Sequence, residues 1–164
     1  MDNRRMIEVI ASDLVKPDQA EAVVALLDEY ASSKMGGGKG LSEFARDNLI
    51  EKLSARTDVV VLLAYHQSTA VGLMIGFEGF STFACKPLLN IHDVIVREAY
   101  RRQGVASQLF TYMQNLALQR GYCKLTLEVL EGNTVAMSAY EKLGFIAYEL
   151  DTSTGKALFM EKLL

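Results

Sequence analysis

The chain has 164 residues, of which 50% are hydrophobic and 23% are charged, and its formal net charge is −3. This length and composition predict one soluble domain, residues 1–164, with a hydrophobic core of its own. The negative net charge argues against a dedicated nucleic-acid-binding protein, because such proteins are normally basic.

The cysteine count and the first residues predict a cytoplasmic protein. Only two cysteines, Cys85 and Cys123, are present, which fits reduced thiols in a reducing compartment better than a disulfide framework. Residues 1–15 are too polar for a signal peptide, and no apolar run approaches the roughly 18 residues that a membrane helix needs. We therefore expect neither a membrane nor a nucleic acid as a partner.

The first part of the chain predicts a strand followed by two helices. Loose alternation favours a strand over residues 6–11. Pro17 then opens a helical run, since its missing N–H would have no partner at a first helical position. The glycine-containing segment 32–40 ends this helix, and Ser42 is suited to cap the next one.

The rest of the chain alternates between strands and helices, which predicts a mixed α/β or α+β domain. The apolar runs 59–65 and 70–77 predict a hairpin. Residues 88–96 predict a strand, and the helix over 104–120 should stop at Gly121. Beyond it we expect a strand at 124–129, a helix capped by Asn133 or Thr134 and ending at Gly144, and final strands at 145–150 and 156–163 around a turn at 151–155.

An arginine-rich turn between the strand at 88–96 and the next helix is the main candidate for a ligand site. Three guanidinium groups, on Arg97, Arg101 and Arg102, lie within six residues and carry the same charge, so they cannot neutralise one another and face either solvent or an anion. Gly104 would let a ligand approach the main chain, and Ala106 is small for the same reason. The helix that follows offers free N–H groups at its positive end. The pattern predicts a phosphate-binding turn or, alternatively, a solvated one.

Four segments in combination resemble one known family. Residues 101–106 (RRQGVA) fit the pattern Q/R-x-x-G-x-G/A, residues 92–100 precede it, and the other two segments are 125–129 and the stretch 133–145 with its YEKLGF ending. Over roughly residues 88–146 the chain resembles the GNAT superfamily of acyl-CoA N-acyltransferases. This resemblance implies an α/β (α+β) fold whose mixed central sheet has about seven strands, splayed between the fourth and the fifth, flanked by about four helices.

The resemblance also implies a site for acetyl-CoA as cosubstrate, with no metal. The pantetheine arm would lie in the opening between the splayed strands and hydrogen-bond their free edge. The residues that would contact the cosubstrate by matching position are Val94, Ile95, Val96, Arg101, Arg102, Gln103, Gly104, Val105, Ala106, Ser107, Asn133 and Tyr140.

The implied activity is transfer of an acetyl group to a primary amine of a small-molecule or amino-acid-like acceptor, by direct attack in a ternary complex. Tyr140 matches the family's proton donor for the departing thiolate, although its place on an apolar helix face equally fits a core residue. His92, Asp93 or a chain of water molecules could act as the base. Polyamine-acetylating relatives tend to carry a carboxylate pair here, so His92 argues against a polyamine acceptor.

Two other functions stay open at this point. One is acetylation of protein lysines or N-termini, and the other is a non-catalytic domain that senses acyl-CoA. The resemblance further implies a homodimer, with an exposed strand edge at 156–164 as one route to it. The loop at 33–41 would border the acceptor site as a mobile lid, or would be a plain surface loop.

Overall fold

The protein is represented by a computed structural model that describes residues 6–148, 153, 155 and 157–163. The chain divides into two compact units, Met1–Glu128 and Val129–Leu164. The expectation of a single domain remains a prediction.

The first unit contains one five-stranded sheet with the strand order β1-β2-β3-β4-β5. Strands β1 to β4 pair antiparallel in sequence order, and β5 runs parallel to β4. The strands are β1 (Ile7–Ala11), β2 (Val59–His66), β3 (Thr69–Ser81), β4 (Lys86–Val96) and β5 (Leu125–Leu127). The mixed sheet of the GNAT-like fold is therefore confirmed.

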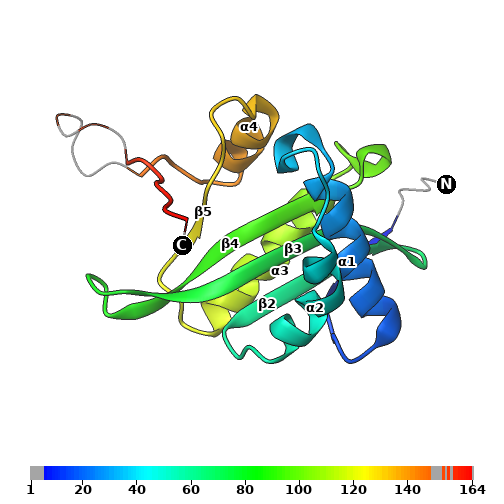
Figure 1. Cartoon of the computed structure of the whole chain (residues 1–164). Helices are drawn as coiled ribbons and strands as arrows, with labels where there is room; N and C mark the ends of the chain where they lie inside the picture. The colour runs from blue at the N-terminus through cyan, green and yellow to red at the C-terminus, as the bar shows by residue number, and fades with distance from the viewer. Residues whose placement is uncertain (1–5, 149–152, 154, 156, 164) are drawn as a thin grey trace. The chain divides into compact units, whose positions relative to one another are not determined.

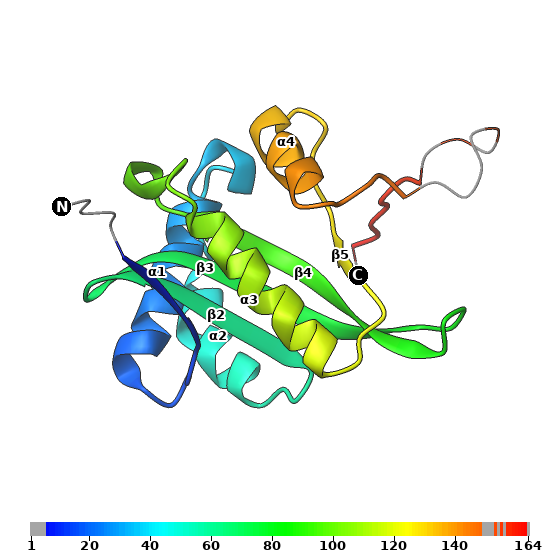
Figure 2. The same cartoon turned by 180° about the vertical axis from the view of Figure 1, so that it is seen from behind.

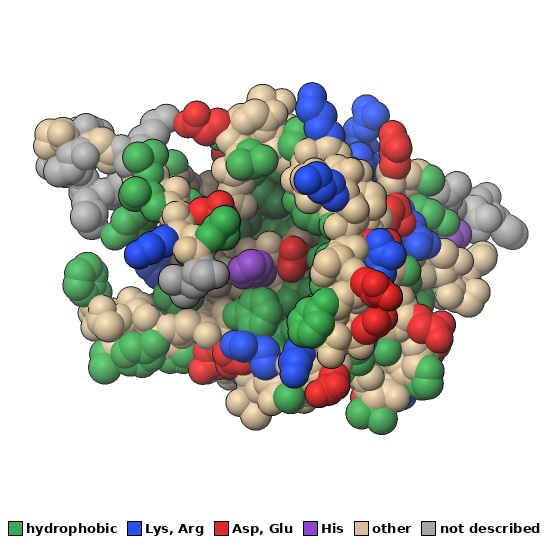
Figure 3. Space-filling view, in the orientation of Figure 1, with side chains coloured by type: hydrophobic (Ala, Val, Ile, Leu, Met, Phe, Trp, Pro, Cys, Tyr) green, Lys and Arg blue, Asp and Glu red, His purple; other side chains and the backbone are tan. Residues whose placement is uncertain are grey.

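Helices cover both faces of this sheet. The helices α1 (Pro17–Ala31) and α2 (Glu43–Ser54) lie on one face (Figure 1). The helix α3 (Val105–Gln119) lies on the other, as the view from behind shows (Figure 2). Basic and acidic side chains are interspersed over the α1 and α2 side (Figure 3), as expected for solvated helix surfaces.

Alternating strand residues pack against these helices and form the core. The cluster beneath α1 and α2 consists of Val23, Leu26, Leu53, Val61, Leu63, Leu73, Ile75 and Ile95. On the opposite face Val105, Leu109 and Met113 of α3 are fully buried. Burial of each such side chain contributes about 1.5–3 kcal/mol, so the sheet and the first turn of α3 are firmly held.

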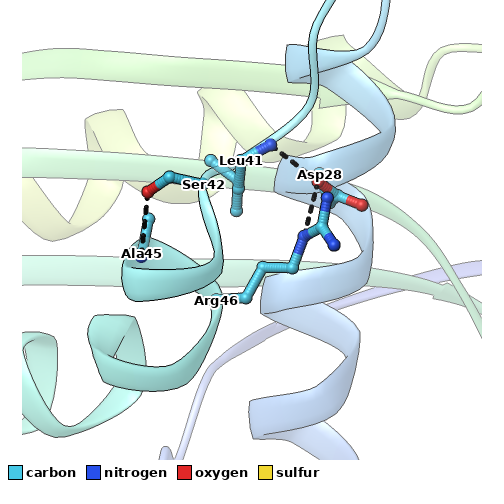
Figure 4. A network of polar contacts seen from close by, with 5 residues as sticks. All are labelled: Asp28, Leu41, Ser42, Ala45 and Arg46. Atoms are coloured by element: carbon cyan, nitrogen blue, oxygen red, sulfur yellow. Dashed lines mark hydrogen bonds and ion pairs between the residues drawn. The ribbon is translucent and has the colours of Figure 1, made fainter.

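The helices begin and end where the sequence predicts. Pro17 is the first residue of α1, and the Ser42 Oγ accepts a hydrogen bond from the Ala45 N–H at 3.1 Å at the start of α2 (Figure 4). Gly121 follows α3 with a φ of 72°, a left-handed conformation that glycine adopts without a steric penalty.

The segment between α1 and α2 is folded against α1. It contains a short 3-10 helix, η1 (Lys34–Gly36). Asp28 Oδ1 accepts hydrogen bonds from the Leu41 N–H at 2.7 Å and from Arg46 Nε at 3.2 Å (Figure 4). One carboxylate of α1 therefore fixes both the end of the loop and the first turns of α2.

The described residues of the second unit contain one helix, α4 (Thr134–Lys142). Of the two caps that the sequence allows, Asn133 is the one used, since its Oδ1 accepts from the Ala136 N–H at 3.2 Å.

The prediction of strands at 145–150 and 156–163 is wrong for the residues that the structure describes. Residues 145–148 and 157–163 form no strand, while residues 149–152, 154 and 156, which include most of the expected turn, lie outside the described part. Apolar alternation favours a strand only where a neighbouring strand supplies hydrogen bonds, and here Ile146 and Phe159 remain 91% and 74% exposed. Over the part of the chain that the structure describes, the sheet therefore has five strands instead of seven.

Candidate acyl-CoA and acceptor site

The strand β4 continues past the end of its neighbour β5. The two strands pair only through Leu89–Leu125, Asn90–Thr126 and Ile91–Leu127, whereas β4 extends to Val96. This is the separation between the fourth and fifth strands that the sequence predicts.

Two residues of β4 direct their backbone N–H and C=O groups toward the edge of β4 that β5 leaves unpaired. The Arg97 N–H donates to the Val71 carbonyl at 2.9 Å. Arg97 is thus a residue whose peptide groups face β3. Because hydrogen-bonded and non-hydrogen-bonded residues alternate along an antiparallel pair of strands, Val94 and Val96 point their peptide groups away from β3. Ile95 points its own toward β3 and buries its side chain in the core. Of the three residues expected to contact pantetheine, Val94 and Val96 therefore present backbone groups, and Ile95 does not.

The turn after β4 is held by hydrogen bonds from its own side chains. Arg101 Nε donates to the Val96 carbonyl at 3.1 Å, and Gln103 Nε2 donates to the Ala99 carbonyl at 2.8 Å. Arg102 and Gly104 both have left-handed backbone conformations, with φ of 59° and 82°. The main reason for glycine at position 104 is therefore this backbone angle.

The turn leads into a helix whose first N–H groups are not capped by a side chain. No side chain caps α3 at Gly104, and its first turn contains no acidic residue. The first N–H groups of a helix, here including those of Val105, Ala106 and Ser107, have no intrahelical partner and lie at its positive end. Such a terminus is suited to bind phosphate. Val105 contributes only its backbone, since its side chain is 1% exposed.

Arg97, the first of the three arginines, is paired within the chain itself. Its Nε lies 2.9 Å from Glu29 Oε2 of α1, and its Nη1 donates to the Ala70 carbonyl at 3.0 Å. Arg97 therefore faces an anion, as one of the two sequence alternatives has it, but this anion is a carboxylate of the chain and not a ligand. Its partner is distant in sequence, and no local pattern indicates it.

His92 and Asp93 lie on the same face of the sheet. Simple alternation predicts opposite faces for adjacent strand residues, and that expectation was wrong. Ile75 pairs with Asp93 but Gly76 pairs with Ile91, so His92 is the extra residue of a β-bulge. The bulge brings His92 Nδ1 within 3.9 Å of Asp93 Oδ2.

Burial raises the pKa of the Asp93 carboxyl, and the nearby His92 opposes this shift. The Asp93 side chain is 23% exposed, whereas that of His92 is 65% exposed. The pair thus combines an accessible imidazole with a partly buried carboxylate beside it, and either group could accept a proton from an amine.

Two further residues lie next to this pair, and the sequence gives no indication of one of them. The Phe77 ring meets the His92 ring edge-on, with centroids 5.5 Å apart. The guanidinium carbon of Arg56 lies 5.0 Å from the centre of the same Phe77 ring. Phe77 belongs to β3, where the sequence allows it either to line an acceptor site or to pack in the core. Nothing in the sequence indicates Arg56, which follows α2.

In the second unit, Tyr140 and Asn133 both belong to α4 or its cap. The Tyr140 ring lies 6.0 Å from the Phe145 ring, and the Asn133 side chain caps the helix. The roles expected for these residues toward acetyl-CoA remain predictions.

The described part of the chain holds neither a cluster of metal ligands nor a helix that could cross a membrane. No three His, Cys, Asp or Glu side chains gather there as metal ligands. No described helix is both long enough and apolar enough to cross a membrane.

Comparison with known proteins identifies the class. Residues 23–145 match the model of the acetyltransferase (GNAT) family, a class of acyl-CoA-dependent N-acetyltransferases. The chain belongs to this family. Three proteins illustrate what it is similar to.

A thialysine N-epsilon-acetyltransferase of Caenorhabditis elegans is 25% identical over 134 residues, covering 80% of each chain. An L-ornithine N5-acetyltransferase of Arabidopsis thaliana is 31% identical over 90 residues, which cover 53% of this chain and 40% of the plant protein. The solved structure of AAC(6')-Iy in complex with a CoA bisubstrate analogue has a TM-score of 0.76. It covers 97% of this chain and 99% of its own at 16% identity, which is a likeness of fold.

Proposed function

We propose that this chain transfers the acetyl group of acetyl-CoA to a primary amine of a small, amino-acid-like acceptor. The observation that carries the proposal is the free edge of β4, which leads through the Arg101–Gly104 turn into the uncapped start of α3. An extended amide-containing arm ending in a pyrophosphate matches such a succession of backbone groups and helix terminus.

The cosubstrate would be held mainly by backbone groups. Val94 and Val96 would hydrogen-bond the pantetheine amides in place of the missing strand. Residues 101–107 would bind the pyrophosphate through N–H groups and through the guanidinium groups of Arg101 and Arg102. A complex of a structural neighbour with a CoA bisubstrate analogue supports this assignment.

The acceptor class is supported by the relatives. The worm and plant proteins are named for thialysine and ornithine, and both compounds are amino acids with an amine at the end of the side chain. The half-buried carboxylate of Asp93 would attract such an amine.

The reaction requires one base and one acid. His92, supported by the charge of Asp93, would take a proton from the acceptor ammonium or from the amine as it attacks the thioester carbonyl. A C–N bond forms and the C–S bond breaks. Tyr140 would give its phenol proton to the departing thiolate, since a phenol with a pKa near ~10 is protonated at neutral pH. Direct transfer in this way needs no covalent intermediate.

Release of free thiol tests the proposal. The protein is incubated with acetyl-CoA and a panel of amines that includes L-ornithine, L-lysine and a lysine peptide. We expect amine-dependent thiol release with a free amino acid, and a loss in kcat of about 10²-fold in Tyr140→Phe, because a positioned proton donor contributes about that much.

Calorimetric titration with coenzyme A provides the control, since Tyr140→Phe should still bind it. Unchanged turnover in this variant would remove Tyr140 from the mechanism. Coenzyme A binding with no thiol release for any amine would favour a sensing domain, and release with the peptide alone would favour a protein acetyltransferase.

A further inference from the structure

Four side chains form a continuous row on the face of the sheet that also carries α1 and α2. We call this row the acceptor row; it consists of Arg56, Phe77, His92 and Asp93. Each member contacts the next: Arg56 lies over the Phe77 ring, Phe77 meets His92, and His92 lies beside Asp93. Basic, hydrophobic, histidine and acidic side chains also follow one another on that face in the space-filling view (Figure 3).

Arg56 is held in place and still has hydrogen-bond donors to offer. Its Nε and Nη2 donate to the two carboxylate oxygens of Asp58 at 2.9 and 2.6 Å. This fork fixes the plane of the guanidinium group. Among the described residues no acceptor pairs with Nη1, and the Arg56 side chain is 48% exposed. The group is therefore oriented, and a ligand can reach it.

The order of the side chains in the row suits an acceptor with two different ends. The Arg56 guanidinium and the His92 imidazole contact the same phenyl ring, at 5.0 and 5.5 Å. An aliphatic chain lying across that ring would bury its methylene groups against an apolar surface. One end of the chain would then meet a cation, and the other would meet the imidazole and carboxylate.

We propose that Arg56 is a specificity residue that binds the carboxylate of an amino-acid acceptor whose side-chain amine lies at His92 and Asp93. The inference rests on the proposed function and adds to it the chemical group that the acceptor must carry. A carboxylate matches the guanidinium in charge and geometry. A diamine would place a second ammonium there instead, and like charges repel.

The test compares two acceptors that differ only in the carboxylate. Acetylation of L-lysine and of cadaverine, its decarboxylated counterpart, is measured as kcat/KM for the wild type and for Arg56→Gln. We expect the wild type to prefer L-lysine and the variant to lose about tenfold or more in kcat/KM for it, as loss of a charge-assisted hydrogen bond predicts. Activity toward cadaverine should fall by less than twofold or rise.

Two further variants sharpen the comparison. Asp58→Asn removes the carboxylate that fixes the plane of the guanidinium group, so the KM for L-lysine should rise while that for cadaverine stays the same, whereas loss of a merely structural ion pair would affect both acceptors alike. Lys52→Gln removes a positive charge from an exposed position of α2 and should leave the acceptor ratio unchanged. Thermal unfolding of each variant verifies that it is folded.

The outcomes separate the two proposals. Thiol release with both acceptors and an identical L-lysine to cadaverine ratio in wild type and Arg56→Gln would overturn the role of Arg56 alone. No release with any amine, despite coenzyme A binding, would overturn the proposed function together with this inference.

Discussion

At the scale of single residues, the position of Asp93 matters more than its presence in the sequence. An ordinary strand would have placed its carboxylate on the opposite face from His92, where neither could influence the other. The bulge places both on one face and leaves the carboxylate partly buried. A chemically useful pair thus arises from one unpaired residue, which alternation in the sequence does not predict.

Replacement of Asp93 by Asn should affect stability and activity in opposite directions. Because its pKa is raised in the folded protein, the ionised carboxyl is a penalty that appears as pH rises through the ordinary value of 3.8 and is complete above the raised pKa. Asp93→Asn should therefore increase the free energy of unfolding at pH 7 but not at pH 3, as urea titrations at the two pH values would show.

The same variant should lose about 10²-fold in kcat if the carboxylate supports proton transfer. A decrease in stability at pH 7 would contradict the burial argument. Unchanged kcat would instead leave Asp93 outside the chemistry and His92 acting without it.

At the scale of elements, the start of α3 depends on a glycine in the sheet below it. A Cβ added at Gly72 would lie 3.0 Å from Val105 Cγ1 and 3.2 Å from the Ile95 carbonyl oxygen. Neither neighbour can move freely, because Val105 anchors the first turn of α3 and Ile95 belongs to the core. The close approach of β3 to this helix is thus part of what positions the proposed phosphate site.

Gly72→Ala should destabilise the protein by about 1–3 kcal/mol, the usual effect of overpacking a core, and should weaken coenzyme A binding by displacing the start of α3. Gly79→Ala in the same strand is the matched control. There the added Cβ would meet only the flexible end of Leu88, at 3.2 Å, so little change is expected. Equal effects of the two substitutions in urea unfolding would contradict the explanation.

The elements also show how far sequence reasoning reaches in this chain. Caps and stops such as Ser42, Asn133 and Gly121 depend on local backbone chemistry, and all three are confirmed. Strand pairing and long-range ion pairs depend on partners elsewhere in the chain. For that reason the bulge at His92 and the Arg97–Glu29 pair could not be predicted.

At the scale of the whole molecule, dependence on partners elsewhere in the chain also explains two failures of the sequence prediction. These are the expected C-terminal strands and the absence of Arg56 from the predicted site. The alternation near Phe159 describes a surface that could pair, but it does not supply a neighbour. Arg56 becomes a candidate site residue only because the fold brings Phe77 next to it and His92 next to Phe77. The turn at Arg101–Ala106 was predictable because all its parts are consecutive.

The expected homodimer can be tested at this scale. Among the C-terminal residues that are described, Leu158, Phe159 and Met160 are 82%, 74% and 84% exposed, and exposed apolar residues in a group are typical of interfaces. Light scattering after size exclusion should give the mass of two chains for the wild type and one for Leu158→Asp. Val15→Asp, at another exposed apolar position (87%), should remain dimeric. A wild type with the mass of one chain would contradict the prediction.

Two adjacent carboxylates at the end of α1 connect regions that would serve different substrates. Asp28 holds the loop before α2, and Glu29 holds Arg97 at the entrance to the β4–α3 turn. Both belong to the same helical turn, so a shift of α1 would move both regions. We therefore predict that any effect of acetyl-CoA on the affinity for the acceptor is matched by an equal effect of the acceptor on the affinity for acetyl-CoA, as thermodynamic linkage requires.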